Sequence, residues 1–359
     1  MCRIVAVAFA FFATDASADC WNFPFPFNAS KVQTAEIVVD KGHLAVGFPD
    51  IGRAFIVSVD LSEAIELHLP RGDVFAGGPG FGRSVALDGD IVAIGAVRIG
   101  GQGAGVEQPA GFFHTGAVYV FDVSSGALLW HAQSDKEKAF GHSVFINADG
   151  VSFGIFEAPE LDGRMLRLHH VARGAIEMWS REGEPLGLID GPSDMRGFGA
   201  ELSGSASLFT IAASADTLNI WMLMPRAGTA IQHASILSTL NRMPAGNLTA
   251  EGSTVAVSAG GGFAAADGRT LLMVPGHSPY EIVGGGPLAL SEDRLSVLVR
   301  SAPEDQPYNQ LVVYDITTNG TLAEAAKINH VVGAALEGVT LFAVLAEPGA
   351  PVRLCKLTT

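Results

Sequence analysis

Two stretches of the chain gather side chains that could act on a ligand. They are residues 97–115 and 157–173, and each lies between runs of apolar and β-branched residues. Carboxylate, imidazole, amide and guanidinium groups can hold a ligand by hydrogen bonds or act as acids and bases. The candidate ligand-binding residues are Arg98, Gln102, Glu107 and His114 in the first stretch, and Glu157, Glu160, Asp162, Arg164, Arg167, His169 and His170 in the second.

The same residues allow two more specific kinds of chemistry. His114, His169 and His170 could join the neighbouring carboxylates at a metal ion, but adjacent histidines on a strand point to opposite faces and seldom share one ion. The carboxylates could form the pair that cleaves a glycosidic bond, although acidic loop residues are more often only solvated. No Gly-x-Ser-x-Gly elbow, phosphate-binding loop or Cys-x-x-Cys pair occurs in the sequence. The sequence therefore predicts no catalytic residue, no metal site and no cofactor.

Short strands in a repeating order must position these stretches. In the clearest unit, Phe81–Ala96 holds two apolar runs around the turn Asp88-Gly89-Asp90, and Gly116–Phe121 is a third run. A fourth run follows at Ala127–Ala132. Turns of Gly and Asp between β-type runs indicate antiparallel hairpins. Four strands in about 50 residues are typical of one propeller blade.

The opening of this unit recurs along the chain. Phe140–Val144 and Phe198–Leu202 match Phe81–Val85, and weaker matches begin at Val32, Gly246, Gly286 and Val332. After each of these seven anchors come a short strand, a tight turn and an apolar strand. The sequence predicts an all-β fold, a seven-bladed β-propeller of four-stranded antiparallel blades. In the fifth repeat, we expect the third and fourth strands at Arg269–Val274 and Pro279–Val283.

The last repeat lacks a fourth strand, whereas the N-terminal segment Cys20–Phe27 has no partner in its own repeat. We expect this segment to complete the last blade as its outer strand and so close the ring. Pro24 and Pro26 suit an edge strand, because their missing N–H groups would both point away from the neighbouring strand. This closure brings Cys20 beside Cys355, and we predict a disulfide between them; two unrelated thiols are the alternative.

The N-terminal residues have the composition of a secretory signal. Arg3 precedes the apolar run Ile4–Ala13, and the small-residue site Ala16-Ser17-Ala18 follows. We predict a signal peptide at residues 1–18, a single propeller domain at residues 19–359, and a secreted or periplasmic location. An uncleaved N-terminal anchor is the alternative. In a eukaryotic host, glycosylation sequons would begin at Asn28, Asn247 and Asn319.

The charge of the chain narrows the range of partners. The formal net charge is −15, which argues against nucleic acid and against an anionic membrane surface. No stretch after the predicted signal is long and apolar enough for a membrane helix. We therefore expect an extracellular protein or glycan as the partner, without membrane insertion.

The sequence pattern of the repeat resembles that of a known family. The order Phe-Gly-x-Ser-Val-Ala, Gly-Asp, Gly-Ala and Gly-x-Val-Tyr-Val-Phe is similar to the FG-GAP repeats of secreted proteins and integrin α-chain propellers, with Val97 in place of a proline. The resemblance implies a propeller that serves in binding or adhesion. Integrin blades hold calcium in an Asp-rich loop between the first two strands, but the turns here are too short to supply its oxygens.

One blade ending resembles a second family. Gly126–Trp130 is similar to the blade endings of quinoprotein dehydrogenases, but only one repeat carries it. We therefore expect Trp130 to pack between blades rather than to indicate that enzyme class.

These observations favour a secreted, non-catalytic propeller that binds a glycan or a protein. The two long stretches connect second to third strands in blades 2 and 3, so we expect them on one face, where propellers usually bind ligands. The alternative is that both stretches only decorate the surface. The alternative functions are an extracellular propeller enzyme, namely a polysaccharide lyase or hydrolase, and a structural protein of the cell envelope.

Overall fold

The structure is a computed structural model. It describes residues 19–24, 31–76, 79–98, 115–133, 138–157, 174–204, 207–213, 217–237, 248–251, 254–259, 262–266, 271–274, 288–291, 294–301, 308–316 and 322–358. The predicted signal peptide and the sequons at Asn28, Asn247 and Asn319 lie outside these residues. Across the described ranges, no helix has the length and apolar character needed to cross a membrane.

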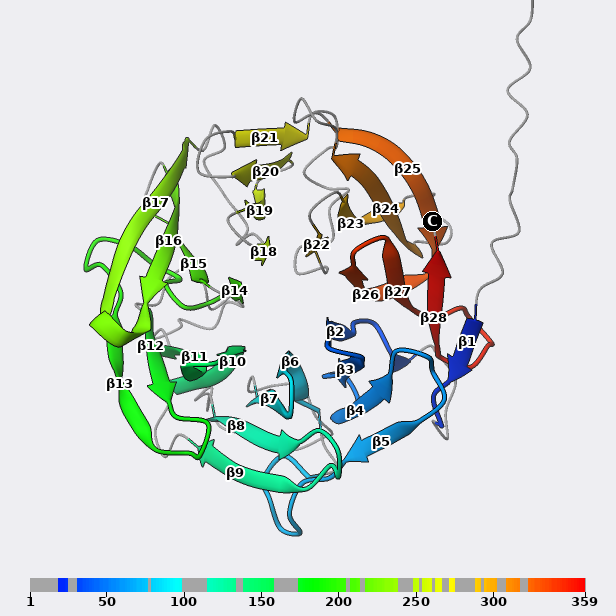
Figure 1. The fold of residues 1–359 in the computed structure, drawn as a ribbon, viewed down its shortest axis with the longest axis horizontal. Coiled ribbons are helices and arrows are strands. Elements are labelled where there is room, and N and C mark those ends of the chain that lie inside the picture. The colour runs from blue at the N-terminus through cyan, green and yellow to red at the C-terminus, as the bar shows by residue number, and fades with distance from the viewer. Residues whose placement is uncertain are drawn as a thin grey trace, which may run out of the picture.

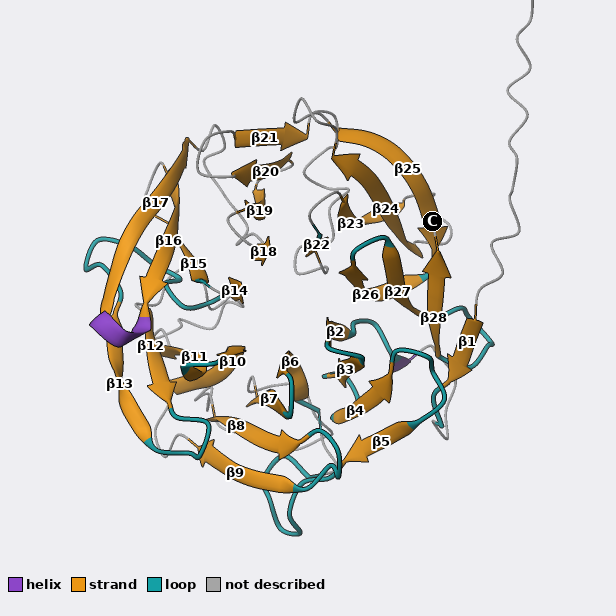
Figure 2. Cartoon of the chain, viewed as in Figure 1, coloured by secondary structure: helices purple, strands orange, loops and turns teal. Residues whose placement is uncertain are grey.

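The described strands form seven antiparallel sheets of four strands each, which we number in chain order (Figure 1; Figure 2). Sheets 1 and 2 contain β2 (Glu36–Asp40), β3 (His43–Phe48), β4 (Arg53–Ser58), β5 (Ala64–Leu67), β6 (Phe81–Asp88), β7 (Ile91–Arg98), β8 (Thr115–Asp122) and β9 (Leu128–Gln133). Sheets 3 and 4 contain β10 (Lys138–Asn147), β11 (Gly150–Glu157), β12 (Gly174–Trp179), β13 (Pro185–Asp190), β14 (Leu202–Gly204), β15 (Leu208–Ala213), β16 (Thr217–Met224) and β17 (Thr229–Leu237).

The remaining sheets complete this arrangement. Sheets 5 and 6 contain β18 (Leu248–Glu251), β19 (Thr254–Ala259), β20 (Gly262–Ala266), β21 (Leu271–Val274), β22 (Leu288–Leu290), β23 (Arg294–Ser301), β24 (Tyr308–Ile316) and β25 (Leu322–Asn329). Sheet 7 contains β26 (Val331–Glu337), β27 (Thr340–Leu345), β28 (Arg353–Thr358) and the N-terminal β1 (Asp19–Asn22). The predicted all-β class of four-stranded antiparallel sheets is confirmed.

Figure 1 shows the sheets arranged about a common centre, with the first strand of each repeat innermost. Each innermost strand contacts that of the next sheet, and β26 of sheet 7 contacts β2 of sheet 1. At this last contact, the backbone N–H of Ala35 donates to the carbonyl oxygen of Val332 at 2.9 Å. The turns that join first to second strands therefore converge at one end of the central axis.

The Phe-Gly anchors mark the starts of the innermost strands: those at Gly82 and Gly141 are bulges in β6 and β10, and Gly199 lies in a turn before β14. Gly82, Gly141 and Gly199 have φ angles of +89°, +74° and +82°, in the left-handed region that favours glycine. The pairing registers of β6 and β10 shift at these bulges. The bulges allow neighbouring sheets to approach closely, since a Cβ atom on Gly95 of sheet 2 would collide with the carbonyl oxygen of Gly141. The repeated glycines thus follow from sheet packing.

The hydrophobic core is divided into layers between neighbouring sheets. Tyr119 and Phe121 of sheet 2 pack with Ile56 of sheet 1, and all three are buried. Phe342 of sheet 7 packs with Val46 of sheet 1. Complete burial of such side chains stabilises a fold by about 1.5–3 kcal/mol each, so these layers hold the sheets together.

Trp130 packs between two sheets, as the sequence predicts. Its ring stacks on Trp179 of sheet 3 with centroids 5.5 Å apart and an interplanar angle of 16°. Its indole N–H donates to the carbonyl oxygen of Arg181 at 2.8 Å. This tryptophan therefore serves the contact between sheets 2 and 3.

The N-terminal strand β1 pairs with β28, and Cys20 lies directly opposite Cys355. The two cysteines form a disulfide, which agrees with the sequence prediction. The strand is shorter than predicted: it ends at Asn22, and Pro24 lies beyond it. Phe23 leaves the strand and is buried, with its ring 4.7 Å from that of Phe48 between centroids. The rest of the predicted strand, residues 25–27, lies outside the described residues.

The fifth sheet differs from the prediction. Its third strand is β20, Gly262–Ala266, so Leu271–Val274 is the fourth strand rather than the third. The sequence Gly-Phe-Ala-Ala-Ala lacks the β-branched residues typical of strands, which explains why β20 was not foreseen. The strand predicted at Pro279–Val283 lies outside the described residues.

Candidate functional site

The structure describes only the margins of the two stretches predicted to bind a ligand. Arg98 ends β7 and pairs with Thr115, while Glu157 ends β11 and pairs with Lys138. These equivalent strand ends place both stretches at the same end of their sheets. The other candidates lie outside the described residues: Gln102, Glu107, His114, Glu160, Asp162, Arg164, Arg167, His169 and His170. Their joint role remains a hypothesis.

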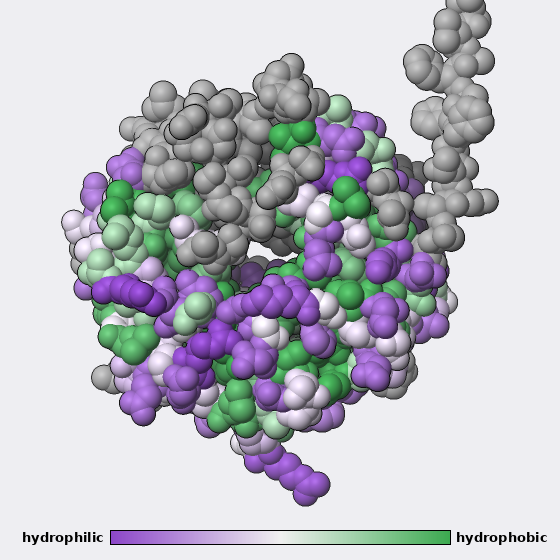
Figure 3. All heavy atoms as spheres, in the orientation of Figure 1, coloured by the Kyte–Doolittle hydropathy of each residue, from purple (hydrophilic) through white to green (hydrophobic). Residues whose placement is uncertain are grey.

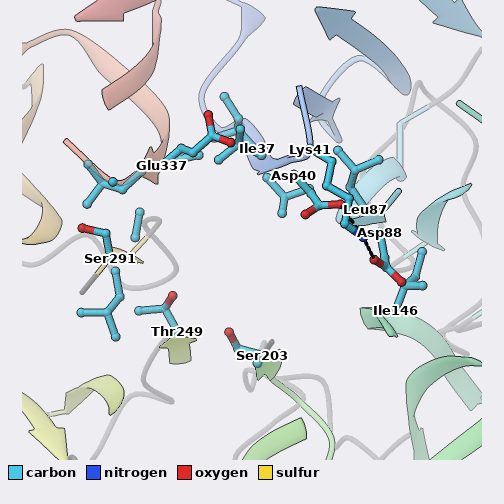
Figure 4. A pocket seen from close by; sticks show the side chains of 18 of the residues that line it. Ile37, Asp40, Lys41, Leu87, Asp88, Ile146, Ser203, Thr249, Ser291 and Glu337 are labelled. Carbon is cyan, nitrogen blue, oxygen red and sulfur yellow. Dashed lines mark hydrogen bonds and ion pairs between the residues drawn. The ribbon is translucent and has the colours of Figure 1, made fainter. Parts of the chain in front are cut away.

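The structure forms a hollow at the opposite end of the sheets. β6 runs from Phe81 to Asp88 and β7 returns to Arg98, so the hairpin turn of sheet 2 lies at the other end of these strands from Arg98. The hollow has a volume of about 900 Å³ and is bordered by the first hairpins of successive sheets (Figure 4). We call it the mouth. Its polar lining residues are Asp40, Lys41, Asp88, Asn147, Asp149, Ser203, Thr249, Ser291 and Glu337.

These side chains meet because the first hairpins of successive sheets converge at one end of the central axis. Each comes from the last residues of an innermost strand or from the turn that follows it, where the chain reverses toward the outside. Such turns favour short polar residues, and seven of them around one axis produce a polar rim. Figure 3 shows hydrophilic residues below and to the right of the centre of the face in view. Aliphatic side chains such as Ile37, Leu87 and Ile146 line the hollow beneath this rim.

A network of ion pairs fixes one arc of the mouth. Lys41 Nζ lies 2.8 Å from Asp88 Oδ1, and Arg181 Nη1 lies 2.8 Å from Asp88 Oδ2. Arg181 also pairs with Asp90 and donates to the backbone oxygen of Asn147. These contacts join sheets 1, 2 and 3. Burial alone would raise the pKa of Asp88, but the hydrogen bonds and charges of Lys41 and Arg181 outweigh it and hold that pKa below its ordinary value.

A second, smaller hollow adjoins the mouth between sheets 3 and 4. It has a volume of about 390 Å³ and shares Asn147, Ala148 and Asp149 with the mouth. Its other lining residues are mostly apolar and include Val151, Met178, Trp179, Leu186 and Pro225. We call it the side hollow. The hairpin that joins β10 to β11 therefore separates a polar space from an apolar one.

A different polar cluster lies at the start of the innermost strands, inside the central channel. Arg83 Nη2 lies 3.2 Å from His142 Nε2, and His142 Nδ1 lies 3.2 Å from the carbonyl oxygen of Ala200. A carbonyl only accepts, so His142 donates from Nδ1 and its unprotonated Nε2 accepts from Arg83. The histidine is buried and neutral in this arrangement. We call this cluster, together with Glu36 and Glu201, the channel cluster.

The two glutamates of the channel cluster have raised pKa values. Burial raises the pKa of Glu201 to about 8; the charge of Glu36 adds to the rise and Arg83 opposes it. Burial likewise raises the pKa of Glu36, again against the charge of Arg83. Both residues are half-buried, so water in the channel still reaches them. Near neutral pH the cluster can take up or release a proton.

Sequence reasoning missed the mouth and the channel cluster. It assigned the turn Asp88-Gly89-Asp90 only to the formation of a hairpin. A signal was present, because charged residues recur in equivalent turns of successive repeats, but their convergence depends on the arrangement of the sheets. In the described part of the chain, no group of three or more His, Cys, Asp or Glu is placed to hold a metal ion.

The comparisons with known proteins identify the fold. No protein-family model matches the sequence, and neither does any curated protein. Among solved structures, the chain is similar to hydrazine synthase of Kuenenia stuttgartiensis, with 11% identity, a TM-score of 0.55, and 94% of this chain and 99% of that chain covered. It is also similar to a putative 6-phosphogluconolactonase from Bacteroides uniformis, with 15% identity, a TM-score of 0.53, and 85% and 90% covered.

A structure described as the Dos1 propeller is similar as well, with 11% identity, a TM-score of 0.52, and 90% of this chain and 78% of that chain covered. Identities this low show the fold alone, and the names of these proteins describe unrelated functions. The resemblance to FG-GAP repeats remains a hypothesis. The four-stranded antiparallel sheets and this likeness together identify the chain as a β-propeller.

Proposed function

We propose that this chain is a secreted, non-catalytic β-propeller that binds an extracellular protein or glycan. The observation that carries the proposal is the mouth, a hollow of about 900 Å³ lined by polar side chains from successive sheets. Hollows of about 300–1,000 Å³ with a few convergent polar groups are typical of ligand sites in proteins. Hydroxyl, amide and carboxylate groups at the rim suit the hydroxyl groups of a sugar or the backbone of a peptide.

The proposed architecture is a single domain of seven blades with FG-GAP-like repeats, closed by the N-terminal strand. Three observations support it: the seven described sheets, the pairing of β1 with β28, and the contact between β26 and β2. The disulfide between Cys20 and Cys355 is compatible with an oxidising compartment and so supports export. The predicted signal peptide at residues 1–18 belongs to the same proposal.

Two candidate sites compete for the ligand. One is the mouth, and the other is the predicted site in the stretches 97–115 and 157–173, whose flanking strand ends lie at the other end of sheets 2 and 3. Binding to a glycan panel and to extracellular proteins would be measured for the wild type, for a variant with both stretches replaced by short Gly-Ser turns, and for Ser203→Trp, which places a bulky indole ring in the mouth. We expect Ser203→Trp to abolish binding and the replacement to preserve it. The opposite pattern would show that the ligand binds at the two stretches and not at the mouth.

The enzyme alternative is tested on the same protein. Alanine at Glu157, Glu160, Asp162, His169 and His170 would abolish turnover of a polysaccharide if these residues were catalytic, whereas a binding module shows no turnover at all. Release of new reducing ends or unsaturated products by the wild type, lost in this variant, would replace the binding proposal with a lyase or hydrolase.

A further inference from the structure

The side hollow differs from the mouth in its chemistry. Val151, Met178, Leu186 and Pro225 give it apolar walls. Trp179 forms a fixed part of the wall: its ring stacks on Trp130, and its indole N–H donates to Glu177 at 2.9 Å. A sugar ring binds best on a freely accessible aromatic face, and that stack already covers one face of Trp179. These walls therefore fit an apolar side chain better than a sugar.

The apolar surface continues outward from the side hollow. Leu186 and Leu188 of β13 are 58% and 52% exposed, although leucine is usually buried. β13 has a bulge at Leu186, because Gly187 pairs with Met178 and Pro185 pairs with Trp179, so the two leucines extend the exposed apolar surface of this strand without following a regular alternation. β13 is the outermost strand of sheet 3, with a neighbour on one side only among the described strands. An extended segment can thus find both apolar contacts and backbone partners here.

The mouth has an excess of negative charge. Asp40, Asp88, Asp149 and Glu337 line it, and the cations beside them are Lys41 and Arg181, which both pair with Asp88. Arg226, at the edge of the side hollow, pairs with Asp149, but its side chain is 86% exposed and so is easily displaced. Within the described residues, no ion pair involves Glu337. A ligand that reaches the mouth from the side hollow therefore meets an excess of carboxylates, and a cationic group complements them.

We propose that the side hollow and the mouth together bind an extended segment of a partner protein. An apolar side chain fills the side hollow, the backbone crosses the hairpin Asn147–Gly150, and a lysine or arginine of the partner reaches the carboxylates of the mouth. This inference rests on the proposed binding function and narrows it to a peptide ligand. The ordered residues around the hairpin favour it, because Arg181 ties the backbone of Asn147 to the ion pairs of sheets 1 and 2.

The test uses a displayed library of random dodecapeptides selected on the mature protein. We expect the enriched peptides to share one large apolar residue and at least one lysine or arginine at a fixed spacing from it. These peptides are then synthesised, labelled, and measured by fluorescence anisotropy against the wild type and the variants Leu186→Asp and Glu337→Lys. Both changes should weaken binding by about tenfold or more, which corresponds to about 1.4 kcal/mol.

Matched controls separate this site from general surface effects. Leu129→Asp changes an equally exposed leucine, 51% against 58%, on the outer strand of sheet 2 and outside both hollows. Glu182→Lys makes the same change of charge as Glu337→Lys on an exposed residue that lines neither hollow. We expect both controls to bind the peptides as the wild type does. Because all four residues are exposed or lie at turns, the variants should fold.

Three outcomes would overturn the inference: no enriched peptide, an acidic consensus, or binding that is unchanged in Leu186→Asp. If no peptide is enriched, binding of the wild type and of Ser203→Trp to a glycan panel is measured as well. Glycan binding that is lost in Ser203→Trp, without any peptide binding, would leave the proposed function intact and reject the peptide ligand. If neither peptides nor glycans nor extracellular proteins bind, both the inference and the proposed function fail.

Discussion

The carboxyl groups at the two ends of the central channel have pKa values that are shifted in opposite directions. At the mouth, Asp88 is shared between Lys41 and Arg181, and its pKa is held below its ordinary value. In the channel cluster, Glu36 and Glu201 have raised pKa values, and Arg83 opposes the rise only in part. Direct hydrogen bonds thus fix the charges at one end, while burial favours the protonated carboxyl group at the other. Four experiments test this contrast, in order of decreasing effect.

Removal of the shared cation should cost the most stability. Arg181→Ala leaves Asp88 and Asp90 without the guanidinium that joins them and frees the carbonyl oxygen of Asn147. We expect the free energy of unfolding to fall by about 2 kcal/mol, since each hydrogen bond to a charged group contributes about 1.5–3 kcal/mol and part of that is recovered by water. Urea denaturation at neutral pH measures the loss.

The matched control for this experiment is Arg196→Ala. Arg196 is exposed, and the structure gives it no ion pair among the described residues. Its replacement should change the stability by less than about 0.5 kcal/mol. Equal effects of the two substitutions would show that the network at the mouth contributes nothing specific.

Glu201→Gln should change how stability depends on pH. In the wild type the folded pKa of about 8 lies above the ordinary value of 4.5, so the folded state binds more protons than the unfolded state between these two pH values. Stability due to this group is therefore full below about 4.5 and is lost as the pH rises through about 8. We expect Glu201→Gln to flatten that decline and to be more stable than the wild type by about 1.5 kcal/mol in alkaline solution, which is less than the full equivalent of the pKa shift because water screens the partly exposed carboxylate. Thermal unfolding across this pH range is the measurement.

Glu184→Gln is the control for that pH series, because Glu184 is exposed on the outside of sheet 3. Its stability curve should follow that of the wild type. A curve for Glu201→Gln that also follows the wild type would mean that Glu201 ionises freely, and the contrast between the two ends would disappear.

Arg83→Met should sharpen the same contrast at the channel cluster. The guanidinium lowers the pKa of both Glu36 and Glu201, so its loss raises both further. We expect an alkaline decline in stability that is steeper by about 1 kcal/mol over the same pH range. Arg83→Lys keeps the charge and should restore most of the wild-type slope. A slope unaffected by either substitution contradicts the assigned role of Arg83.

Asp88→Asn should give the smallest effect, and in the opposite pH direction. Because the folded pKa of Asp88 is lowered, its ionised form stabilises the protein above the ordinary value of 3.8 and loses that effect as the pH falls through the folded pKa. We expect the variant to be about 0.5 kcal/mol less stable at neutral pH and to converge with the wild type in acid. A constant difference down to strongly acidic pH would assign the loss to packing instead.

The sequence predicts most of the strands because their signals are local. Alternating apolar runs and Gly-Asp turns identify β6 and β7. The last repeat lacks a fourth strand and the N-terminal segment lacks a partner, and these two observations together identify the pairing of β1 with β28. The exception, β20, is built from alanine and glycine, which carry little strand preference. Local pattern is therefore sufficient wherever β-branched and aromatic residues mark the strands.

The candidate site could not be predicted in the same way. Asp88 and Arg181 are 93 residues apart, and their contact exists only because sheets 2 and 3 bring a first hairpin beside a third-to-fourth strand turn. A turn residue in the sequence indicates only that the chain reverses. Whether it also faces a shared space depends on how successive repeats are placed around the axis, and a single sequence does not encode that placement locally.

The disulfide between Cys20 and Cys355 has a mechanical consequence. Their separation of 335 residues means that one covalent bond bypasses nearly the whole propeller. Tension applied to the chain outside these two cysteines passes through β1, the disulfide and β28, and the intervening sheets bear almost none of it. Reduction of this bond would place the sheets in series with the load, so the oxidised propeller should resist pulling in a force spectrometer at loads that unravel the reduced form.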